Sequence, residues 1–307
     1  MRKYIDYIKK YKLGEIYCNK TFKDITTIKI GGKIKLLYYP NTIGNFIHFY
    51  KYYLIDKKYP LIIIGNGSNI LANSSEYNGI VISLKKIIYK YILYNDIIIV
   101  NSGVMINDLI HFSKRNNLGG LEKLYCIPAT VGGLIKMNGS AYDLAISDQL
   151  ISIKIINDKG EIKVLKKEDI QFQYRKTNIP NNYIIIECTF KLNKTKKEHI
   201  DEQLKKIIND RKAKQPLNEF NAGSTFKNPI NYPAWKLIND VGLRGYSVND
   251  AHISQKHCNF LINKNNCTSD DMIILINKIK EEVFKKYNII LECEWIFINF
   301  KKTISFF

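Results

Sequence analysis

The 307-residue sequence lacks the features that mark membrane and secreted proteins. No apolar run approaches the length of a membrane span, although hydrophobic residues make up 46% of the chain. Charges interrupt the first ten residues, so we expect them not to form a signal peptide. The six cysteines are scattered, without a Cys-x-x-Cys pair or a His/Cys cluster at metal-ligand spacing. We therefore expect a reduced, cytoplasmic protein without a metal site.

Acidic residues are few: 28 Asp and Glu stand against 47 Lys and Arg, which gives a net charge of +19. Such a balance is typical of nucleic-acid-binding proteins. Here, however, the lysines are spread along the whole chain, and Ile, Asn, Tyr and Phe are abundant too, as expected when a coding sequence drifts towards AT-rich codons. We interpret the excess charge as solvated surface that helps to gather anionic nucleotides, and we expect no nucleic-acid partner.

The chain also lacks internal repeats and low-complexity linkers, and its strand and helix patterns alternate. We expect residues 1–20 to form a short amphipathic helix and residues 26–30 to form a strand. A hairpin over 151–156 and 161–165, a charged helix over 196–212 and a strand over 183–191 follow. Thr268 is a candidate N-cap for a long helix, and residues 289–297 are expected to form the last strand.

Three loops rich in small residues stand out from these elements. The stretch Gly65-Asn-Gly-Ser-Asn69 follows the buried-strand pattern of residues 61–64, and a loop of this kind can turn several N–H groups towards a phosphate. It is not a Rossmann fingerprint, because Ile70 stands where the third glycine belongs. The stretch 127–133 contains Pro128 and the pair Gly132-Gly133, which lets a ligand approach the backbone closely. By itself, the stretch 127–133 is equally compatible with a tight helix start.

The third loop, Asn221-Ala-Gly-Ser-Thr-Phe-Lys-Asn-Pro229, has one hydroxyl at its centre. Ser224 follows Gly223 directly, so the backbone can bend sharply and present the hydroxyl group. Taken alone, this stretch is more simply a Ser/Asn/Gly loop between elements. Two further polar residues, Arg175 and Glu294, are its candidate partners.

Taken together and in order, these motifs resemble one family. They are Gly-x-Gly-Ser-Asn, Ile-Pro-x-Thr-Val-Gly-Gly, Tyr-Arg-Lys-Thr, Ala-Gly-Ser-Thr-Phe-Lys-Asn-Pro, Ser-x-Lys-His-x-Asn-Phe and Leu-Glu-x-Glu, between about residues 20 and 298. The sequence resembles the UDP-N-acetylenolpyruvoylglucosamine reductases (UDP-N-acetylmuramate dehydrogenases) of peptidoglycan synthesis, which serve cell-wall biogenesis, cell shape and cell division. The short span between Arg175 and Ser224 resembles the subtype without an extra tyrosine-bearing substrate loop.

The resemblance implies an α+β fold. Its FAD-binding region is of the vanillyl-alcohol-oxidase type, in two subdomains at residues 1–88 and 89–195, and an α/β substrate-binding domain follows at 196–307. It also implies non-covalent FAD, NADPH as electron donor and a UDP-sugar enolpyruvyl substrate. In the family, NADPH reduces FAD, and hydride then passes from flavin N5 to the enolpyruvyl β-carbon while the α-carbon receives a proton. We expect a monomer.

The resemblance further implies roles for individual residues. Ser224 matches the proton donor, and Arg175 and Glu294 match the pair that polarises the substrate carboxylate and stabilises the enolate-like intermediate. These residue types suit the chemistry, because developing negative charge needs a cation and a hydrogen-bonding acid nearby. The positions that match FAD contacts are Gly65, Asn66, Gly67, Ser68, Asn69, Ile127, Pro128, Ala129, Thr130, Val131, Gly132, Gly133 and Asn138. Lys214, Asn228 and His257 match positions on the substrate side, although His257 without the family is more simply a surface or capped histidine.

The sequence departs from the family pattern at three places. Ala129 stands where glycine is usual, Gly139-Ser-Ala-Tyr-Asp143 replaces an Ala-Gly-Ala-Tyr-Gly run, and Asn249-Asp250 replaces a glycine-rich pair. The first two touch the geometry of the FAD loops and bear on flavin affinity. Two other classes stay open: another FAD oxidoreductase of the same fold acting as an oxidase, and a basic nucleic-acid-binding protein.

Overall fold

The computed structural model describes residues 1–88 and 90–300, and the chain forms two compact units. Unit 1 consists of Met1–Cys18, Lys35–Asn66 and Asn78–Asp210. Unit 2 consists of Asn19–Ile34, Gly67–Tyr77 and the residues from Arg211 onward. Each unit is therefore assembled from three separate segments of the chain. The three-part division at residues 88 and 195 stays a prediction.

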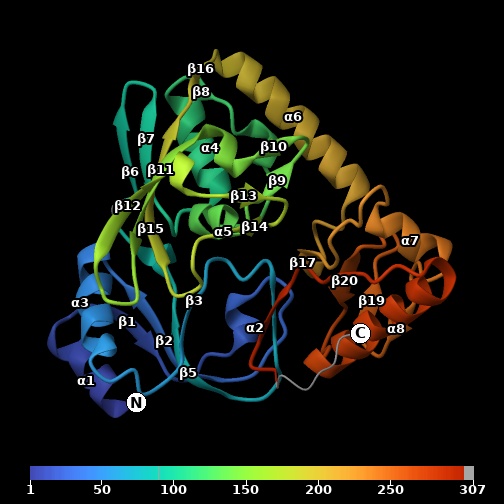
Figure 1. The fold of residues 1–307 in the computed structure, drawn as a ribbon, viewed down its shortest axis with the longest axis horizontal. Coiled ribbons are helices and arrows are strands. Elements are labelled where there is room, and N and C mark those ends of the chain that lie inside the picture. The colour runs from blue at the N-terminus through green and yellow to red at the C-terminus, as the bar shows by residue number, and fades with distance from the viewer. Residues whose placement is uncertain (89, 301–307) are drawn as a thin grey trace. The chain divides into compact units, whose positions relative to one another are not determined.

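A four-stranded sheet forms the first half of unit 1, in the order β1-β2-β5-β3. Its strands are β1 (Gly14–Tyr17), β2 (Ile34–Pro40), β5 (Tyr77–Ile82) and β3 (Leu61–Ile63). Strands β3 and β5 are parallel, whereas β1 and β2 are antiparallel. Helices α1 (Arg2–Lys10) and α3 (Ile43–Leu54) pack with this sheet, as Figure 1 shows. Tyr4 and Ile8 of α1 are fully buried, because residues four apart lie on one helix face.

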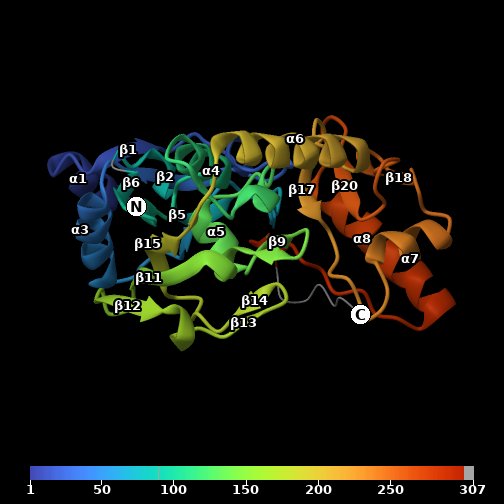
Figure 2. The ribbon, with the colours of Figure 1, turned by 90° about the horizontal axis from the view of Figure 1, so that it is seen from above.

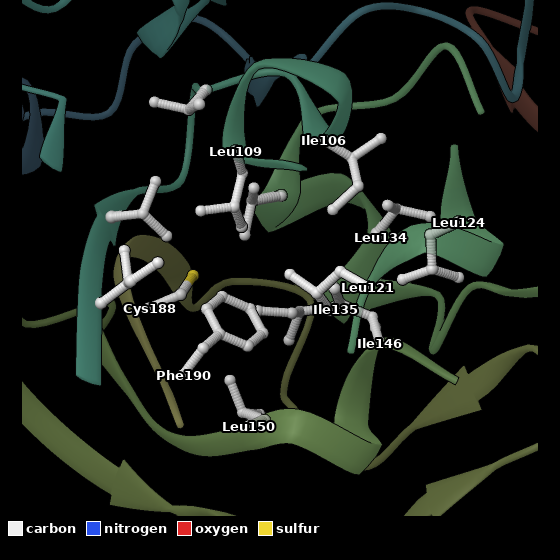
Figure 3. Packing of buried hydrophobic residues seen from close by; sticks show 14 of the residues in the cluster. Ile106, Leu109, Leu121, Leu124, Leu134, Ile135, Ile146, Leu150, Cys188 and Phe190 are labelled. Carbon is white, nitrogen blue, oxygen red and sulfur yellow. The ribbon is translucent and has the colours of Figure 1, made fainter. Parts of the chain in front are cut away.

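A five-stranded antiparallel sheet in the order β12-β11-β15-β7-β6 forms the second half. Its strands are β12 (Ile162–Lys166), β11 (Leu150–Ile156), β15 (Ile184–Lys191), β7 (Ile97–Asn101) and β6 (Tyr91–Tyr94). Helices α4 (Ile106–Arg115) and α5 (Val131–Lys136) supply the other side of its core, which Figure 3 shows around Phe190 and Leu150. The inner face of α4, which is Ile106, Leu109, Ile110 and Ser113, is buried. The predicted hairpin and the strand at 183–191 are confirmed as β11–β12 and β15.

Unit 2 is built on a second four-stranded sheet, β17-β20-β19-β18. Its strands are β17 (Phe220–Ser224), β20 (Phe260–Asn263), β19 (Ala251–Ile253) and β18 (Ser247–Val248). Helix α8 (Ser269–Tyr287) packs on this sheet, and α7 (Ala234–Asp240) lies against α8 (Figures 1 and 2). Thr268 caps α8 as predicted: its hydroxyl accepts the N–H of Asp271 at 3.1 Å. Strand β21 (Ile296–Ile298) runs parallel to β4 (Ile70–Ala72).

The smaller elements complete the described chain. The charged helix predicted over 196–212 is α6 (Lys197–Lys214), whose end contains the change from unit 1 to unit 2. The remaining short elements are α2 (Phe22–Ile25), β8 (Leu118–Gly119), β9 (Ser140–Ala141), β10 (Leu144–Ala145), β13 (Phe172–Gln173), β14 (Lys176–Thr177), β16 (Asn193–Lys194) and the 3-10 helices η1 (Leu84–Lys86), η2 (Glu122–Leu124), η3 (Ile146–Gln149) and η4 (Lys167–Asp169).

Three predicted elements are wrong. The first helix ends at Lys10 and does not fill residues 1–20, because the backbone turns left-handed at Lys12 and β1 follows. Residues 26–30 form no strand: Ile28 and Ile30 are buried, but Lys29 has φ +59° and no neighbouring strand pairs with the segment in the described chain. The segment 289–297 is not one strand either. It forms a single β-bridge at Cys293 before β21 begins at Ile296.

Candidate active site

In unit 1, two of the predicted cofactor loops touch each other. A Cβ atom added to Gly65 would lie 2.4 Å from Oγ1 of Thr130, so only glycine permits this approach. Beside it, Nδ2 of Asn66 donates to the carbonyl of Pro128 at 2.8 Å. Thr130 in turn caps α5, because its Oγ1 accepts the N–H of Gly133 at 3.3 Å. The end of β3 is thereby fixed to the start of α5.

The two loops differ in whether their backbone N–H groups have hydrogen-bond acceptors in the protein. Across residues 1–88 and 90–300, the N–H groups of residues 65–69 find no protein acceptor. In the other loop, Val131 donates to Val104 at 2.8 Å and Gly132 to Ser102 at 2.9 Å. Open backbone amides in a small-residue loop are the donors that a phosphate group needs. Residues 65–69 therefore fit the pyrophosphate of FAD, and residues 127–133 frame that loop.

Asn138 is a second feature that fits a bound cofactor. Its side chain is 9% exposed, its backbone has φ +42°, and Nδ2 donates to the carbonyl of Gln173 at 3.1 Å. Oδ1 of Asn138 has no hydrogen-bond partner among the described residues. Since buried acceptors are nearly always satisfied, this atom is available to a donor of a ligand.

Arg175 lies at the tip of the short hairpin β13–β14, in unit 1. Its backbone is left-handed, with φ +56°, a conformation that costs a non-glycine residue free energy. Its Nη1 donates to Oγ of Ser140 at 2.7 Å, and its guanidinium lies 4.9 Å from the ring centroid of Tyr174. Just after the hairpin, the carbonyls of Ile179 and Pro180 accept from Nζ of Lys136 at 2.6 and 2.9 Å. The guanidinium is thus aimed by specific contacts.

Ser140 belongs to the run 139–143 that departs from the family pattern. Tyr142 and Asp143 in this run have φ of +51° and +60°, where glycine would be free of strain. The hydroxyl of Tyr142 donates to Oδ2 of Asp210 at 2.6 Å. The run therefore keeps its turn without glycine and adds a hydroxyl that binds Arg175. Ser140 was not among the predicted site residues; its place in an altered run was the available signal.

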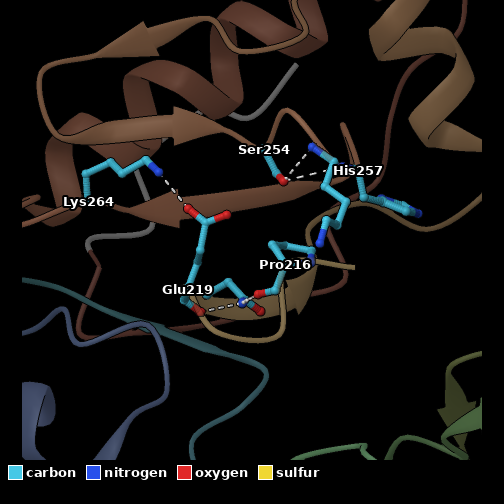
Figure 4. Close-up of polar contacts among 7 residues, drawn as sticks. Pro216, Glu219, Ser254, His257 and Lys264 are labelled. Atoms are coloured by element: carbon cyan, nitrogen blue, oxygen red, sulfur yellow. Dashed lines mark hydrogen bonds and ion pairs between the residues drawn. The ribbon is translucent and has the colours of Figure 1, made fainter. Parts of the chain in front are cut away.

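The Ser224 loop is held within unit 2 by asparagine and threonine side chains. Oδ1 of Asn221 accepts the N–H of Gly223 at 2.9 Å, and Gly223 has φ +74°. Nδ2 of Asn221 donates to the carbonyls of Pro216 and Glu219, whose loop Figure 4 shows. These contacts present Ser224, which is half-buried, at the end of β17 opposite Phe260.

Glu294 is joined to the same loop through its backbone. Its N–H donates to the carbonyl of Thr225 at 2.8 Å, and Nδ2 of Asn69 donates to its carbonyl at 3.1 Å. Glu294 is half-buried, whereas Glu292 is exposed and pairs with Nζ of Lys227. Unit 2 therefore brings the segments of Ser224 and Glu294 together, and Arg175 is positioned by unit 1. The side chain of Asn69, predicted to contact FAD, binds the Glu294 segment.

The three predicted substrate-side residues differ in their surroundings. Lys214 is exposed at the end of α6, and Oδ1 of Asn228 accepts the N–H of Ala234, the first residue of α7, at 3.0 Å. His257 is half-buried, and Figure 4 shows its N–H beside Ser254, whose Oγ accepts it at 3.3 Å. Nδ1 of His257 accepts the N–H of Asn259 at 3.3 Å, which leaves the proton of the neutral ring on Nε2. Burial lowers the pKa of His257, so the ring is neutral at pH 7.

Comparisons with known proteins identify the family. The UDP-N-acetylenolpyruvoylglucosamine reductase of Clostridium tetani is 35% identical over 304 residues, which cover 97% of this chain and 98% of the relative. The enzyme of that name from Pelagibacter ubique is 38% identical over 269 residues, which cover 86% and 88%. This chain belongs to the UDP-N-acetylenolpyruvoylglucosamine reductase family. The predicted family and enzyme class are thereby confirmed.

The structural and domain comparisons agree with membership of the reductase family. The crystal structure of UDP-N-acetylenolpyruvylglucosamine reductase from Thermus caldophilus matches with a TM-score of 0.79 at 30% identity, over 93% of this chain and 98% of that one. A model described as an FAD binding domain matches residues 35–166, and one described as the C-terminal domain of the reductase matches residues 215–298. The predicted fold class and FAD as cofactor are confirmed, with NADPH as the donor that the family implies.

No group of His, Cys, Asp and Glu side chains within 1–88 and 90–300 is arranged to hold a metal ion. None of the helices in that part of the chain is long and apolar enough to cross a membrane.

Proposed function

We propose that this chain reduces UDP-N-acetylglucosamine enolpyruvate to UDP-N-acetylmuramate, with NADPH as the electron donor and non-covalent FAD as the cofactor. One observation carries the proposal: the Ser224 loop is hydrogen-bonded directly to the segment of Glu294, inside the region that matches the reductase's C-terminal domain. The combination of a hydroxyl and a carboxyl group on one braced framework suits protonation of an enolate-like carbon.

The cofactor is assigned to the loops of unit 1 and their continuation. The open amides of residues 65–69 would hold its pyrophosphate, and Oδ1 of Asn138 would accept from one of its donors. When bound, FAD supplies hydride chemistry that no side chain can perform. Thr130, Gly132 and Gly133 keep the framing loop in place through α5.

Ser224 is assigned the role of the acid that delivers a proton to the substrate's α-carbon. A serine hydroxyl is a weak acid, so it transfers its proton only to a strongly basic carbon and only from a fixed position. The left-handed Gly223 and the amide of Asn221 provide that fixed position.

Arg175 and Glu294 are assigned the task of binding the carboxylate of the enolpyruvyl group as negative charge develops on it. A guanidinium matches a carboxylate in shape and charge, and Ser140 restrains the orientation of Arg175. The half-buried Glu294 is the glutamate of the pair 292/294 that has less contact with water, which favours its acting as a hydrogen-bonding acid.

The test is to follow the two half-reactions separately in a stopped-flow instrument without oxygen. Ser224→Ala is expected to keep NADPH-dependent bleaching of the flavin nearly intact and to stop reoxidation by the enolpyruvyl substrate. Slowing of both half-reactions to a similar degree would make Ser224 a residue that positions the flavin. Release of yellow FAD into the supernatant after acid precipitation tests non-covalent binding.

The finer predictions remain part of this proposal. They are a role in peptidoglycan synthesis and hence in cell shape and division, a cytoplasmic location, a monomeric state and the subtype without the tyrosine-bearing loop. The buried thiols of Cys188, Cys258 and Cys267, whose pKa values burial raises, suit a reducing compartment, where thiols serve as small apolar side chains.

A further inference from the structure

Within the motif Ser254–Phe260 the family resemblance assigned a role to His257 and none to Asn259. Its side chain is only 3% exposed and makes a matched pair of hydrogen bonds with one other residue. Its Oδ1 accepts the N–H of Phe226 at 2.9 Å, and its Nδ2 donates to the carbonyl of Phe226 at 2.8 Å. The side-chain amide thus satisfies both backbone groups of a residue that is itself 1% exposed.

The backbone of Asn259 continues the same contact. Its carbonyl accepts the N–H of Thr225 at 2.8 Å, and the next residue, Phe260, is the register partner of Ser224. The hydrogen bonds between β17 and β20 therefore continue beyond Ser224, and at Phe226 the side-chain amide of Asn259 takes the place of the backbone groups of a paired strand. This holds residues 224–226 along one edge.

The other edge of these residues is held by the segment of Glu294. The carbonyl of Thr225 accepts the N–H of Glu294 at 2.8 Å, and Phe226 forms a β-bridge with Cys293. Thr225 and Phe226 are thus bonded to Asn259 on one side and to the Glu294 segment on the other. The side chain of Thr225 adds nothing to this, because its buried Oγ1 has no hydrogen-bond partner in the described chain.

We propose that Asn259 is a positioning residue that fixes the Ser224 hydroxyl and the Glu294 carboxyl relative to each other. The proposal rests on the function proposed above for these two groups. Without the side-chain amide, Phe226 loses both of its bonds to Asn259, and its β-bridge with Cys293 is the backbone pairing that still holds it between Ser224 and Glu294. A small displacement of a catalytic group slows its own step and leaves other steps alone.

Asn263 offers a matched control at the other end of β20. It is also a buried asparagine, 2% exposed, and it satisfies backbone groups of two other segments. Nδ2 donates to the carbonyl of Ile28 at 2.9 Å, and Oδ1 accepts the N–H of Cys267 at 3.1 Å. Asn263 is paired with Phe220, at the far end of β17 from Ser224.

The experiment compares Asn259→Ala and Asn263→Ala, both loaded with FAD, in anaerobic stopped-flow measurements and in thermal unfolding. Both variants are expected to unfold at lower temperature, since each substitution leaves buried backbone groups without hydrogen-bond partners. Asn259→Ala alone is expected to slow reoxidation of the reduced flavin by substrate about 10- to 100-fold. Its rate of flavin reduction by NADPH and the substrate KM should stay within about twofold of wild type, the change expected when binding is retained.

Asn259→Asp keeps the size of the side chain and the acceptor for the N–H of Phe226, so it should lose less of the rate than Asn259→Ala. It also decides the question if the alanine variant fails to fold. A rate of reoxidation equal to that of Asn263→Ala, or equal slowing of both half-reactions, would overturn the positioning role. If Ser224→Ala itself leaves reoxidation unchanged, the function proposed for Ser224 fails instead.

Discussion

The guanidinium of Arg175 is bonded to the hydroxyl of Ser140, with Nη1 donating to Oγ at 2.7 Å. Ser140 stands where the run Ala-Gly-Ala-Tyr-Gly of the family pattern has glycine, so a protein with that run lacks the hydroxyl group that makes this contact. A hydrogen bond to a charged group is worth about 1.5–3 kcal/mol. It restrains a side chain whose backbone is already left-handed.

Replacing Ser140 by alanine should therefore misalign Arg175. We expect about a tenfold lower rate of flavin reoxidation by substrate, the factor that corresponds to 1.4 kcal/mol, with little change in flavin reduction by NADPH. Tyr142→Phe is the control, because it removes another hydroxyl group of the run 139–143, one that donates to Asp210. If both variants reoxidise at the wild-type rate, the Ser140 contact does not orient the guanidinium for catalysis.

Glu294→Gln should lower the rate of flavin reoxidation by at least about 100-fold, the scale of a lost acid or electrostatic group. Glu292→Gln should cost clearly less, since the Glu292 side chain is 72% exposed and its carboxylate pairs with Lys227. Stopped-flow reoxidation without oxygen measures both. Greater damage in Glu292→Gln would mean that the roles of the two glutamates are reversed.

Gly65→Ala should weaken FAD binding by about tenfold or more, because the new Cβ would meet Oγ1 of Thr130 at 2.4 Å and push the two loops apart. Gly44→Ala in α3 is the control: its Cβ would lie 3.6 Å from Oγ1 of Thr42, an ordinary contact. Titration of the apoproteins with FAD, followed by flavin fluorescence, measures the affinities. Equal affinities in the two variants would show that the loop contact is not needed.

The stability of the protein should decline on mild acidification, partly through His257. Burial lowers the pKa of this imidazole below its ordinary value of 6.5, so the unfolded chain takes up the proton at higher pH than the folded protein. Its contribution to the free energy of unfolding is complete above pH 6.5 and is lost as the pH falls through and below that value. Urea unfolding of His257→Gln between pH 8 and 5 should show a shallower decline than wild type; parallel curves would contradict this.

Much of the fold was predictable from local signals. Thr268 followed by Asp271 marked the start of α8, and the spacing of Ile106, Leu109 and Ile110 marked the inner face of α4. These signals act over a single turn of helix, where sequence and structure are directly coupled. The strand expected over 26–30 failed because alternate burial of Ile28 and Ile30 does not require a pairing partner.

The sequence predicted which residues belong to the candidate site, but it did not predict the hydrogen bonds between them. The loops and Ser224 stood out as runs of small polar residues, and the family resemblance supplied Arg175 and Glu294. The strand expected over 289–297 does not include the two glutamates, since residues 289–295 form no regular strand. Ser140 and Asn259 act through contacts across 35 and 33 residues of sequence, and no local pattern encodes such distances.

Unit 2 draws its core from three stretches of the chain, and two of them are translated early. Ile28, Ile30 and Leu71 pack in one cluster with residues of α8, and β4 pairs with β21 near the end of the described chain. During synthesis, these apolar segments therefore cannot complete their packing until α8 and β21 have been made. A fragment that begins at residue 196 would lack them, and we infer that it cannot serve as an autonomous folding module.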